Sequence, residues 1–175
     1  MRIKLVGTFL GKLAIIVGLV MFCPLILAVA QNDYAAISFA TAISISLLVG
    51  VFLLYACRSE QMGALRQREG FAIVSFGWLL ASALGALPFF LSGSVPTFID
   101  AFFETASGFT TTGATVYADV ESLPQSLLLW RGLTYWLGGL GIVVLFVAIL
   151  STGPGGTGSS GPVSYTHLDV YKRQY

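Results

Sequence analysis

Charged residues are scarce in this sequence, and the residue types that bind metals are nearly absent. Of its 175 residues, 10% are charged and 56% are hydrophobic, against about 25% and about 45–50% in soluble domains. A soluble fold of this composition would have too little polar surface to cover its core. Lysine and arginine form no dense cluster that could bind phosphates, which argues against nucleic-acid binding. We therefore expect an integral membrane protein.

Histidine and cysteine are among the rarest residues of the chain. The single histidine is His167, and the two cysteines, Cys23 and Cys57, lie within or at the end of apolar runs. No second cysteine or histidine stands at metal-binding spacing, so neither a zinc site nor a disulfide framework is predicted. Both thiols are expected to be buried and inert.

Four apolar segments are each long enough to cross a bilayer, because about 20 helical residues at 1.5 Å each span a core of about 30 Å. They cover residues 9–30, 35–57, 71–92 and 127–150. Pro24 is expected to kink the first span, since its ring removes a backbone donor. Arg2, Lys4 and the small residues 28–30 also fit a cleavable signal peptide, but the long apolar stretch and the spans that follow favour a retained span. Lys12, near the start of this span, is expected to extend its ammonium to the headgroups.

Basic residues gather on one predicted side of the membrane. They occur near the N-terminus and in the loop 58–70, whereas the stretch between Gly70 and Trp130 holds four acids and no lysine, arginine or histidine. The positive-inside rule then orients the N-terminus and the loop 58–70 toward the cytoplasm and residues 93–126 outward. Trp130, Tyr135 and Trp136 would lie in the outer aromatic belt.

The connection between the third and fourth spans is longer than a tight turn needs. Pro96 and Thr97 open a short amphipathic helix, in which Asp100 suits the helix dipole. Its apolar residues recur at helical spacing and would pack against the flanking spans: Ile99, Phe102, Phe103 and Ala106. Gly108 is expected to end this helix, and residues 110–114 to follow in extended form, with Gly113 free to adopt unusual dihedrals.

This order of span, short helix, polar loop and span predicts a pore loop. Irregular backbone at membrane depth is tolerated where it lines a water-filled path, and loop carbonyls can replace the water shell of an ion. The partially negative C-terminus of the short helix and the acids of the outer segment would both favour a cation. The alternative is an extracellular threonine-rich linker that merely touches the bilayer surface.

Two charged side chains accompany the loop. Glu104 is expected to accept hydrogen bonds that hold the loop, since a buried carboxylate needs partners; direct contact with an ion is the alternative. Arg131 either pairs with an acid of the outer segment or extends to the headgroups. Sequence alone does not choose between these two roles.

Seven short motifs occur in order along residues 1–150: REGF at 68–71, GALPF at 85–89, DAFFE at 100–104, SG at 107–108, TTTGAT at 110–115, WLGGLGI at 136–142 and AIL at 148–150. Together they resemble the Trk/Ktr-type potassium uptake proteins of bacteria and their relatives in fungi and plants. The two extra spans before the first hairpin look more like the Trk branch than the Ktr branch.

The resemblance implies an all-α integral membrane fold, with two N-terminal spans plus one span–pore loop–span repeat of a potassium-channel-like fold. The two N-terminal transmembrane helices would lie within residues 1–57 and a cytoplasmic loop within 58–70. The repeat would cover 71–150, with a pore helix at about 97–108 and a filter at about 110–115. Four such repeats surround one pore in the family.

The resemblance also implies what the protein would bind. Carbonyls of Thr111 and Thr112, with Gly113 next to them, would coordinate potassium in the selectivity filter, flanked by Thr110 and Ala114. The implied function is potassium uptake across the bacterial inner membrane, without catalytic residues and with no cofactor or metal beyond the transported potassium. Besides the lipid bilayer, the implied partners are a cytoplasmic nucleotide-binding regulatory subunit and a second copy of the full-length subunit.

The resemblance weakens after residue 150. A Gly-rich segment follows, and residues 163–175 resemble translated sequencing-adapter DNA, so the tail 151–175 is excluded from fold reasoning. Gly156, Gly158 and Gly161 match a dinucleotide fingerprint by spacing alone, since no strand precedes them. One repeat supplies a quarter of a filter, so the sequence is expected to be an N-terminal fragment of a protein several times longer.

Two other functions compete with transport. A non-conducting membrane scaffold would use Gly138, Gly139 and Gly141 only for close helix packing. A membrane-embedded hydrolase would use Ser107 or a loop threonine as nucleophile, but such a residue needs an oriented base. Glu104 is the only acid nearby.

Overall fold

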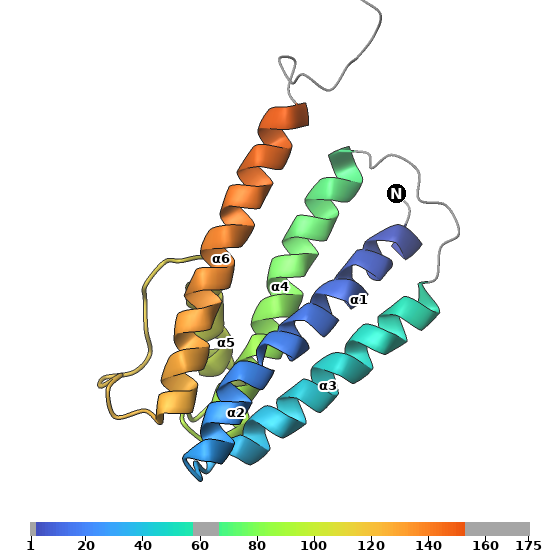
Figure 1. Ribbon diagram of the computed structural model, residues 1–175. Helices are drawn as coiled ribbons and strands as arrows, with labels where there is room; N and C mark the ends of the chain where they lie inside the picture. Colours follow the sequence, from blue (N-terminus) through green and yellow to red (C-terminus); the bar gives the residue numbers. More distant parts are fainter. Residues whose placement is uncertain (1–2, 58–66, 153–175) are drawn as a thin grey trace, which may run out of the picture. The chain divides into compact units, whose positions relative to one another are not determined.

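The computed structural model describes residues 3–57 and 67–152, with side chains for 3–57 and 68–143, and helices are the regular secondary structure of this part of the chain (Figure 1). Its helices are α1 Ile3–Val20, α2 Phe22–Ala30, α3 Ala35–Ala56, α4 Gln67–Leu91, α5 Phe98–Phe109 and α6 Gln125–Thr152. Two compact units divide the chain at residue 139, within α6. Most of the predicted loop 58–70, the tail beyond 152 and His167 lie outside the described residues.

The first predicted span consists of two helices separated by a break at Met21. The break falls one turn before Pro24, whose ring clashes with the carbonyl four residues earlier and cannot donate to it. Helical hydrogen bonding resumes when the Leu25 amide donates to the Met21 carbonyl at 3.1 Å. The predicted kink is thus confirmed, and α1 begins at Ile3, earlier than the apolar run suggested.

Small residues hold α1 and α3 together in an antiparallel pair, which we call, with α2, the N-terminal hairpin. The buried face of α3 carries a small residue at every fourth position: Ser38, Ala42, Ser46 and Gly50. A Cβ on Gly50 would lie only 2.9 Å from the Gly11 carbonyl oxygen. Such small residues let helix backbones approach closely in a membrane.

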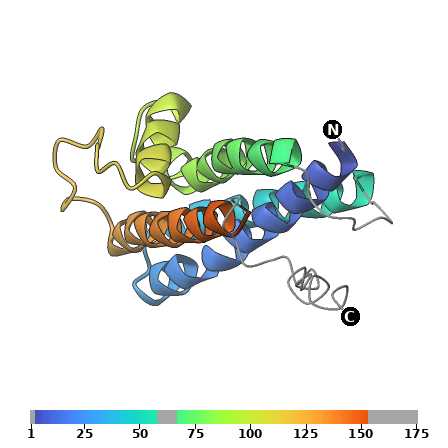
Figure 2. The ribbon, with the colours of Figure 1, turned by 90° about the horizontal axis from the view of Figure 1, so that it is seen from above.

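Helix α4 packs against α1 and α3, and α5 runs back along α4 (Figures 1 and 2). Residues 67–70, predicted as the end of a loop, form the first turn of α4 and bury Glu69. From the end of α5, the segment 110–124 extends away and returns to the start of α6, as both views show. The molecule therefore holds a short helix and an irregular segment between two long helices.

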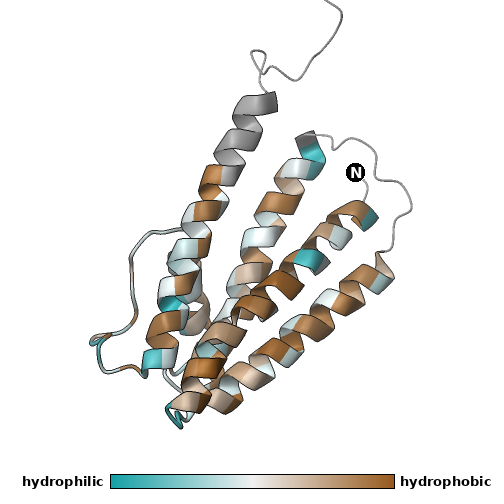
Figure 3. Ribbon diagram, in the orientation of Figure 1, coloured by the Kyte–Doolittle hydropathy of each residue, from teal (hydrophilic) through white to brown (hydrophobic). Residues whose placement is uncertain are grey.

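Three helical stretches are long and apolar enough to cross a membrane: Ile3–Ala30, Ala35–Ala56 and Arg68–Leu91. Figure 3 shows that apolar residues predominate along these helices, with hydrophilic positions near the N-terminal ends of α1 and α4. The fourth predicted span falls within α6. The all-α membrane class is therefore confirmed. One expectation is wrong: Cys23 is exposed at the surface, and Cys57, whose thiol lies beside Gly7 of α1, is only half-buried.

Candidate functional site

The short helix α5 begins at a threonine N-cap. The Thr97 hydroxyl oxygen accepts a hydrogen bond from the Asp100 amide at 3.1 Å and donates to the Asp100 carboxylate at 2.7 Å. A threonine at the N-cap satisfies an amide that would otherwise lack a partner, and an acid in the first turn favours the helix dipole. These local signals explain why a helix starts immediately after Pro96.

The buried face of α5 carries mainly small and polar residues, with one aromatic residue at its end. It consists of Ala101, Glu104, Thr105, Ser107, Gly108 and Phe109. The sequence-based expectation was wrong for Ile99 and Phe103, whose side chains are 77% and 47% exposed. The amphipathic pattern is inverted because the outward face of a membrane helix meets apolar surroundings, while the inward face must hold polar contacts.

Glycines allow the C-terminus of α5 to lie deep between α4 and α6. A Cβ on Gly85 of α4 would lie 2.6 Å from Thr105 Cγ2, and one on Gly138 of α6 would overlap the Phe109 carbonyl. Gly138 is roughly 20 Å along α6 from its start at 1.5 Å per residue. The end of α5 therefore lies beside the middle of α6, far from its first residue. Gly139 meets nothing within 4 Å, so it does not serve this packing.

The helix ends in a Schellman motif with a threonine in the left-handed position. Amides of Thr111 and Thr112 donate to the carbonyls of Gly108 and Ser107, both at 2.9 Å, and Thr111 has φ 54°. This pairing is the usual helix C-terminal arrangement, in which glycine normally occupies the left-handed residue. The helix thus ends at Phe109 and turns through Thr110, so the extended form predicted from Thr110 was wrong at its start.

Carbonyl oxygens of residues 110–113 are free within the described structure. None of the donors described there reaches them, whereas the next carbonyl, that of Ala114, accepts the Ser107 hydroxyl at 2.6 Å. The Thr110 and Thr112 hydroxyls bond to each other at 2.7 Å. Gly113 has φ 85°, and a Cβ added there would meet nothing within 4 Å. The chain therefore presents a short run of unpaired carbonyls that ends at Ala114, an anchor that the motif alone did not reveal.

Glu104 is the centre of the polar contacts behind this run. One carboxylate oxygen accepts the Thr115 hydroxyl at 2.8 Å and the Val116 amide at 3.0 Å. The other accepts Arg131 Nε at 2.6 Å, and the carboxylate is fully buried while the Arg131 side chain is 21% exposed. Glu104 therefore ties the loop to both α5 and α6, as expected, and Arg131 pairs with this acid.

Aromatic side chains of α6 have different roles from those predicted. Trp130 is fully buried, and its indole N–H donates to the Gly85 carbonyl at 2.9 Å, so it belongs to the core and not to an interfacial belt. Tyr135 contacts Arg131 through its ring and hydroxyl. Only Trp136, at 63% exposed, faces outward.

A second polar contact fastens the loop just beyond Val116. The Tyr117 and Ser94 hydroxyls lie 2.9 Å apart, and Ser94 also donates to the Phe89 carbonyl. Burial raises the pKa of Tyr117 to about 12. The phenol is protonated at neutral pH and can donate a hydrogen bond. The loop is thus fastened at Ala114, at Thr115–Val116 and at Tyr117, directly after the free carbonyls.

Comparison with known proteins defines the class first: this fold is that of a multi-pass membrane transport protein. The crystal structure of the potassium transporter TrkH from Vibrio parahaemolyticus superposes with a TM-score of 0.81 at 32% identity, over 98% of this chain and 36% of that one. The sequence profile of TrkH, a cation transport protein, matches residues 35–161. The chain belongs to the TrkH family of cation transport proteins.

Individual relatives agree with this assignment. The Trk system potassium uptake protein TrkH of Escherichia coli K12 is 40% identical over 151 residues, 86% of this chain and 31% of the relative. An uncharacterised cation transporter of Methanocaldococcus jannaschii is 33% identical over 94% of this chain and 33% of its own length. The chain thus spans about a third of the length of these relatives. They are transporters, so the hydrolase alternative is excluded.

Proposed function

We propose that this chain is the first part of a potassium uptake subunit, and that Thr111, Thr112 and Gly113 supply one strand of its selectivity filter. The observation that carries this proposal is the run of free carbonyls at 110–113, held from behind by Ser107 and Glu104 at the C-terminus of α5. Thr110 flanks the strand on one side. The Ala114 carbonyl, bonded to Ser107, ends it on the other.

The backbone of this strand supports ion coordination. Left-handed residues recur at alternate positions, with φ 54° at Thr111 and 85° at Gly113. Left-handed residues break the regular alternation of an extended strand, in which successive residues face opposite sides. A β-branched residue in the left-handed region costs roughly 1–2 kcal/mol, and such strain is typical of functional segments.

The surroundings of the strand also favour a cation. The C-terminus of α5 carries the negative end of the helix dipole, worth roughly half an elementary charge. Carbonyl oxygens would replace the water shell of potassium, and three further strands from later repeats would complete the coordination. One strand alone does not bind an ion, because it supplies one quarter of the coordinating oxygens.

We further propose the orientation and partners of the full-length protein in the bacterial inner membrane. With the N-terminus cytoplasmic and the loop 110–124 outside, potassium moves inward and gains about 2.3 kcal/mol per charge for each 100 mV. Potassium uptake in the relatives named above supports this direction, as do the basic residues at the ends of α1 and α4. A dimer of full-length subunits and a cytoplasmic nucleotide-binding regulatory subunit belong to the same proposal.

Rubidium uptake by the full-length protein in a transport-deficient cell tests the filter assignment. Gly113→Ala should lower uptake about tenfold or more, because alanine cannot hold φ 85° without strain of about 1 kcal/mol or more. Gly139→Ala is the matched control, since that position is open in a helix. If the protein were a non-conducting scaffold, neither the wild type nor the variants would take up rubidium. Equal loss of uptake in Gly113→Ala and Gly139→Ala would contradict the role of Gly113.

A further inference from the structure

We propose that the outward face of the N-terminal hairpin binds bilayer lipid directly, with Lys12 holding the phosphate of an anionic phospholipid. The relatives are about three times as long as this chain, so later segments will cover much of its surface. The outward face of the N-terminal hairpin, by contrast, contacts lipid. It does not depend on the filter assignment.

The two faces of α3 differ in the size of their residues. Its inward face is the small-residue stripe described above, which already packs against α1. Its outward face carries large apolar side chains, among them Ile37, Leu48 and Phe52, which are 76%, 70% and 67% exposed. Small residues mark helix–helix contacts in membranes, so the bulky face is the one left for acyl chains.

Hydroxyl groups on the outward face of α3 are satisfied within the helix itself. The Thr41 hydroxyl donates to the Ser38 carbonyl at 2.9 Å and lies 3.0 Å from that of Ile37. The Ser44 hydroxyl donates to the Ala40 carbonyl at 2.9 Å. A hydroxyl facing a protein partner has the option of bonding across the interface, whereas lipid chains offer no partner at all. Because these hydroxyls are already bonded within α3, the face can contact acyl chains without leaving a polar group unpaired.

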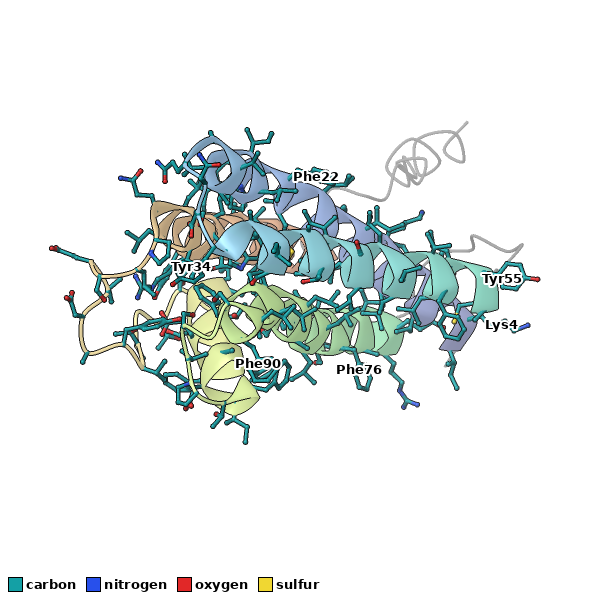
Figure 4. All side chains as sticks on the ribbon, turned by 90° about the horizontal axis from the view of Figure 1, so that it is seen from below. Lys4, Phe22, Tyr34, Tyr55, Phe76 and Phe90 are labelled. Carbon is teal, nitrogen blue, oxygen red and sulfur yellow. The ribbon has the colours of Figure 1, made fainter. Side chains whose placement is uncertain are left out.

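Tyrosines mark both ends of this face. Tyr34 and Tyr55 are 63% and 84% exposed and lie at opposite ends of α3, with Lys4 at the same end as Tyr55 (Figure 4). Their spacing along the helix is about 31 Å at 1.5 Å per residue, which matches a hydrocarbon core of about 30 Å. Exposed tyrosines at both interfaces are typical of lipid-facing helices.

Lys12 supplies the charge that complements a phosphate. It is exposed in the third turn of α1, where its ammonium lies 5.8 Å from the Phe9 ring centre. The described carboxylates form no ion pair with it. Neighbouring Gly11 contacts Gly50 and Leu53 of α3, so Lys12 lies just inside the Tyr55 boundary, within reach of the headgroups.

An apolar track continues from Lys12 along the same helix face. Ile16 and Leu19 follow it by four and seven residues and are 52% and 54% exposed. Residues at this spacing share one face of a helix. A headgroup bound at Lys12 would therefore find a surface for its acyl chain directly below it.

Spin labelling of the full-length protein in phosphatidylcholine–phosphatidylglycerol vesicles tests which medium covers α3. After replacement of native cysteines, labels at Ile37, Leu48 and Phe52 should collide readily with oxygen and poorly with a water-soluble nickel chelate. A label at the exposed loop residue Glu121 should show the reverse and serves as the control. Poor collision of the α3 labels with both reagents would mean that protein covers the face, and ready collision with nickel would mean water. Either result would overturn the proposal.

The phosphate contact is tested by lipid selectivity. Lys12→Gln should lower the preference for phosphatidylglycerol over phosphatidylcholine about fivefold, the equivalent of about 1 kcal/mol per basic residue near an anionic surface. Lys12→Arg should keep the preference. Both variants must retain the wild-type melting temperature, which separates lipid binding from folding. An unchanged preference in Lys12→Gln would refute the headgroup contact, whatever the spin labels report.

Discussion

Replacing Glu104 by glutamine is the sharpest test of how the loop is held. The change keeps the side-chain volume but removes the charge that Arg131 Nε approaches at 2.6 Å. If the side-chain oxygen of the new glutamine keeps the bonds to Thr115 and Val116, the side-chain NH₂ group faces the arginine donor. At least one contact is therefore lost. Breaking a buried ion pair costs about 3–5 kcal/mol. Because Arg131 is 21% exposed and water can solvate it in part, we expect a loss of about 2–3 kcal/mol.

The assay combines stability with selectivity. Unfolding of the purified full-length protein should show the expected loss for Glu104→Gln, whereas Asp100→Asn, on the same helix but confined to the exposed cap, should lose about 0.5–1 kcal/mol. Uptake by Glu104→Gln should also discriminate less between rubidium and sodium, because the loop loses its support. The double variant with Arg131→Gln should be less damaged than the two single losses added together. Additive losses, or a loss no larger than that of Asp100→Asn, would refute the reasoning.

Three further predictions follow from the described contacts. Gly138→Ala should destabilise the protein by about 1–3 kcal/mol, because its Cβ meets the rigid Phe109 backbone, while Gly139→Ala should be neutral or stabilising in the same melting experiment. Ser46→Ala should leave stability unchanged or raise it, since this buried hydroxyl has no partner among the described residues; a large loss in melting temperature would contradict this. With the pKa of Tyr117 raised to about 12, the unfolded phenol loses its proton first, so the free energy of unfolding should fall from about pH 10 to about pH 12. The measurement is the free energy of unfolding as a function of pH for the wild type and for Tyr117→Phe. The difference between the two curves should contain this fall, because the variant lacks the phenol.

Much of the architecture could be predicted because it depends on local rules. Apolar runs of membrane-spanning length identified the long helices, and Pro24 identified the break before α2. Thr97 and Asp100 marked the start of α5. Each of these signals acts within one or two turns of the chain, where spacing alone decides the outcome.

The errors in the candidate site have a common cause. Ile99 and Phe103 of α5 were expected to face inward, as in a water-soluble protein, but both face outward. Trp130 was expected at the interface, but it is buried and bonded to Gly85. In a membrane both sides of a helix meet apolar material, so hydrophobicity does not tell the inward face from the outward face.

By itself, the sequence determined that this protein crosses a membrane, where its long helices lie and where a short helix and a threonine–glycine segment interrupt them. Only the tertiary structure decided that Glu104 pairs with Arg131, 27 residues away, and that Ser107 closes the run of free carbonyls at Ala114. Helix length and capping follow from neighbouring residues along the chain. The pairing of buried polar groups depends on which helix faces approach each other, and in this protein glycines at 85 and 138 set that approach.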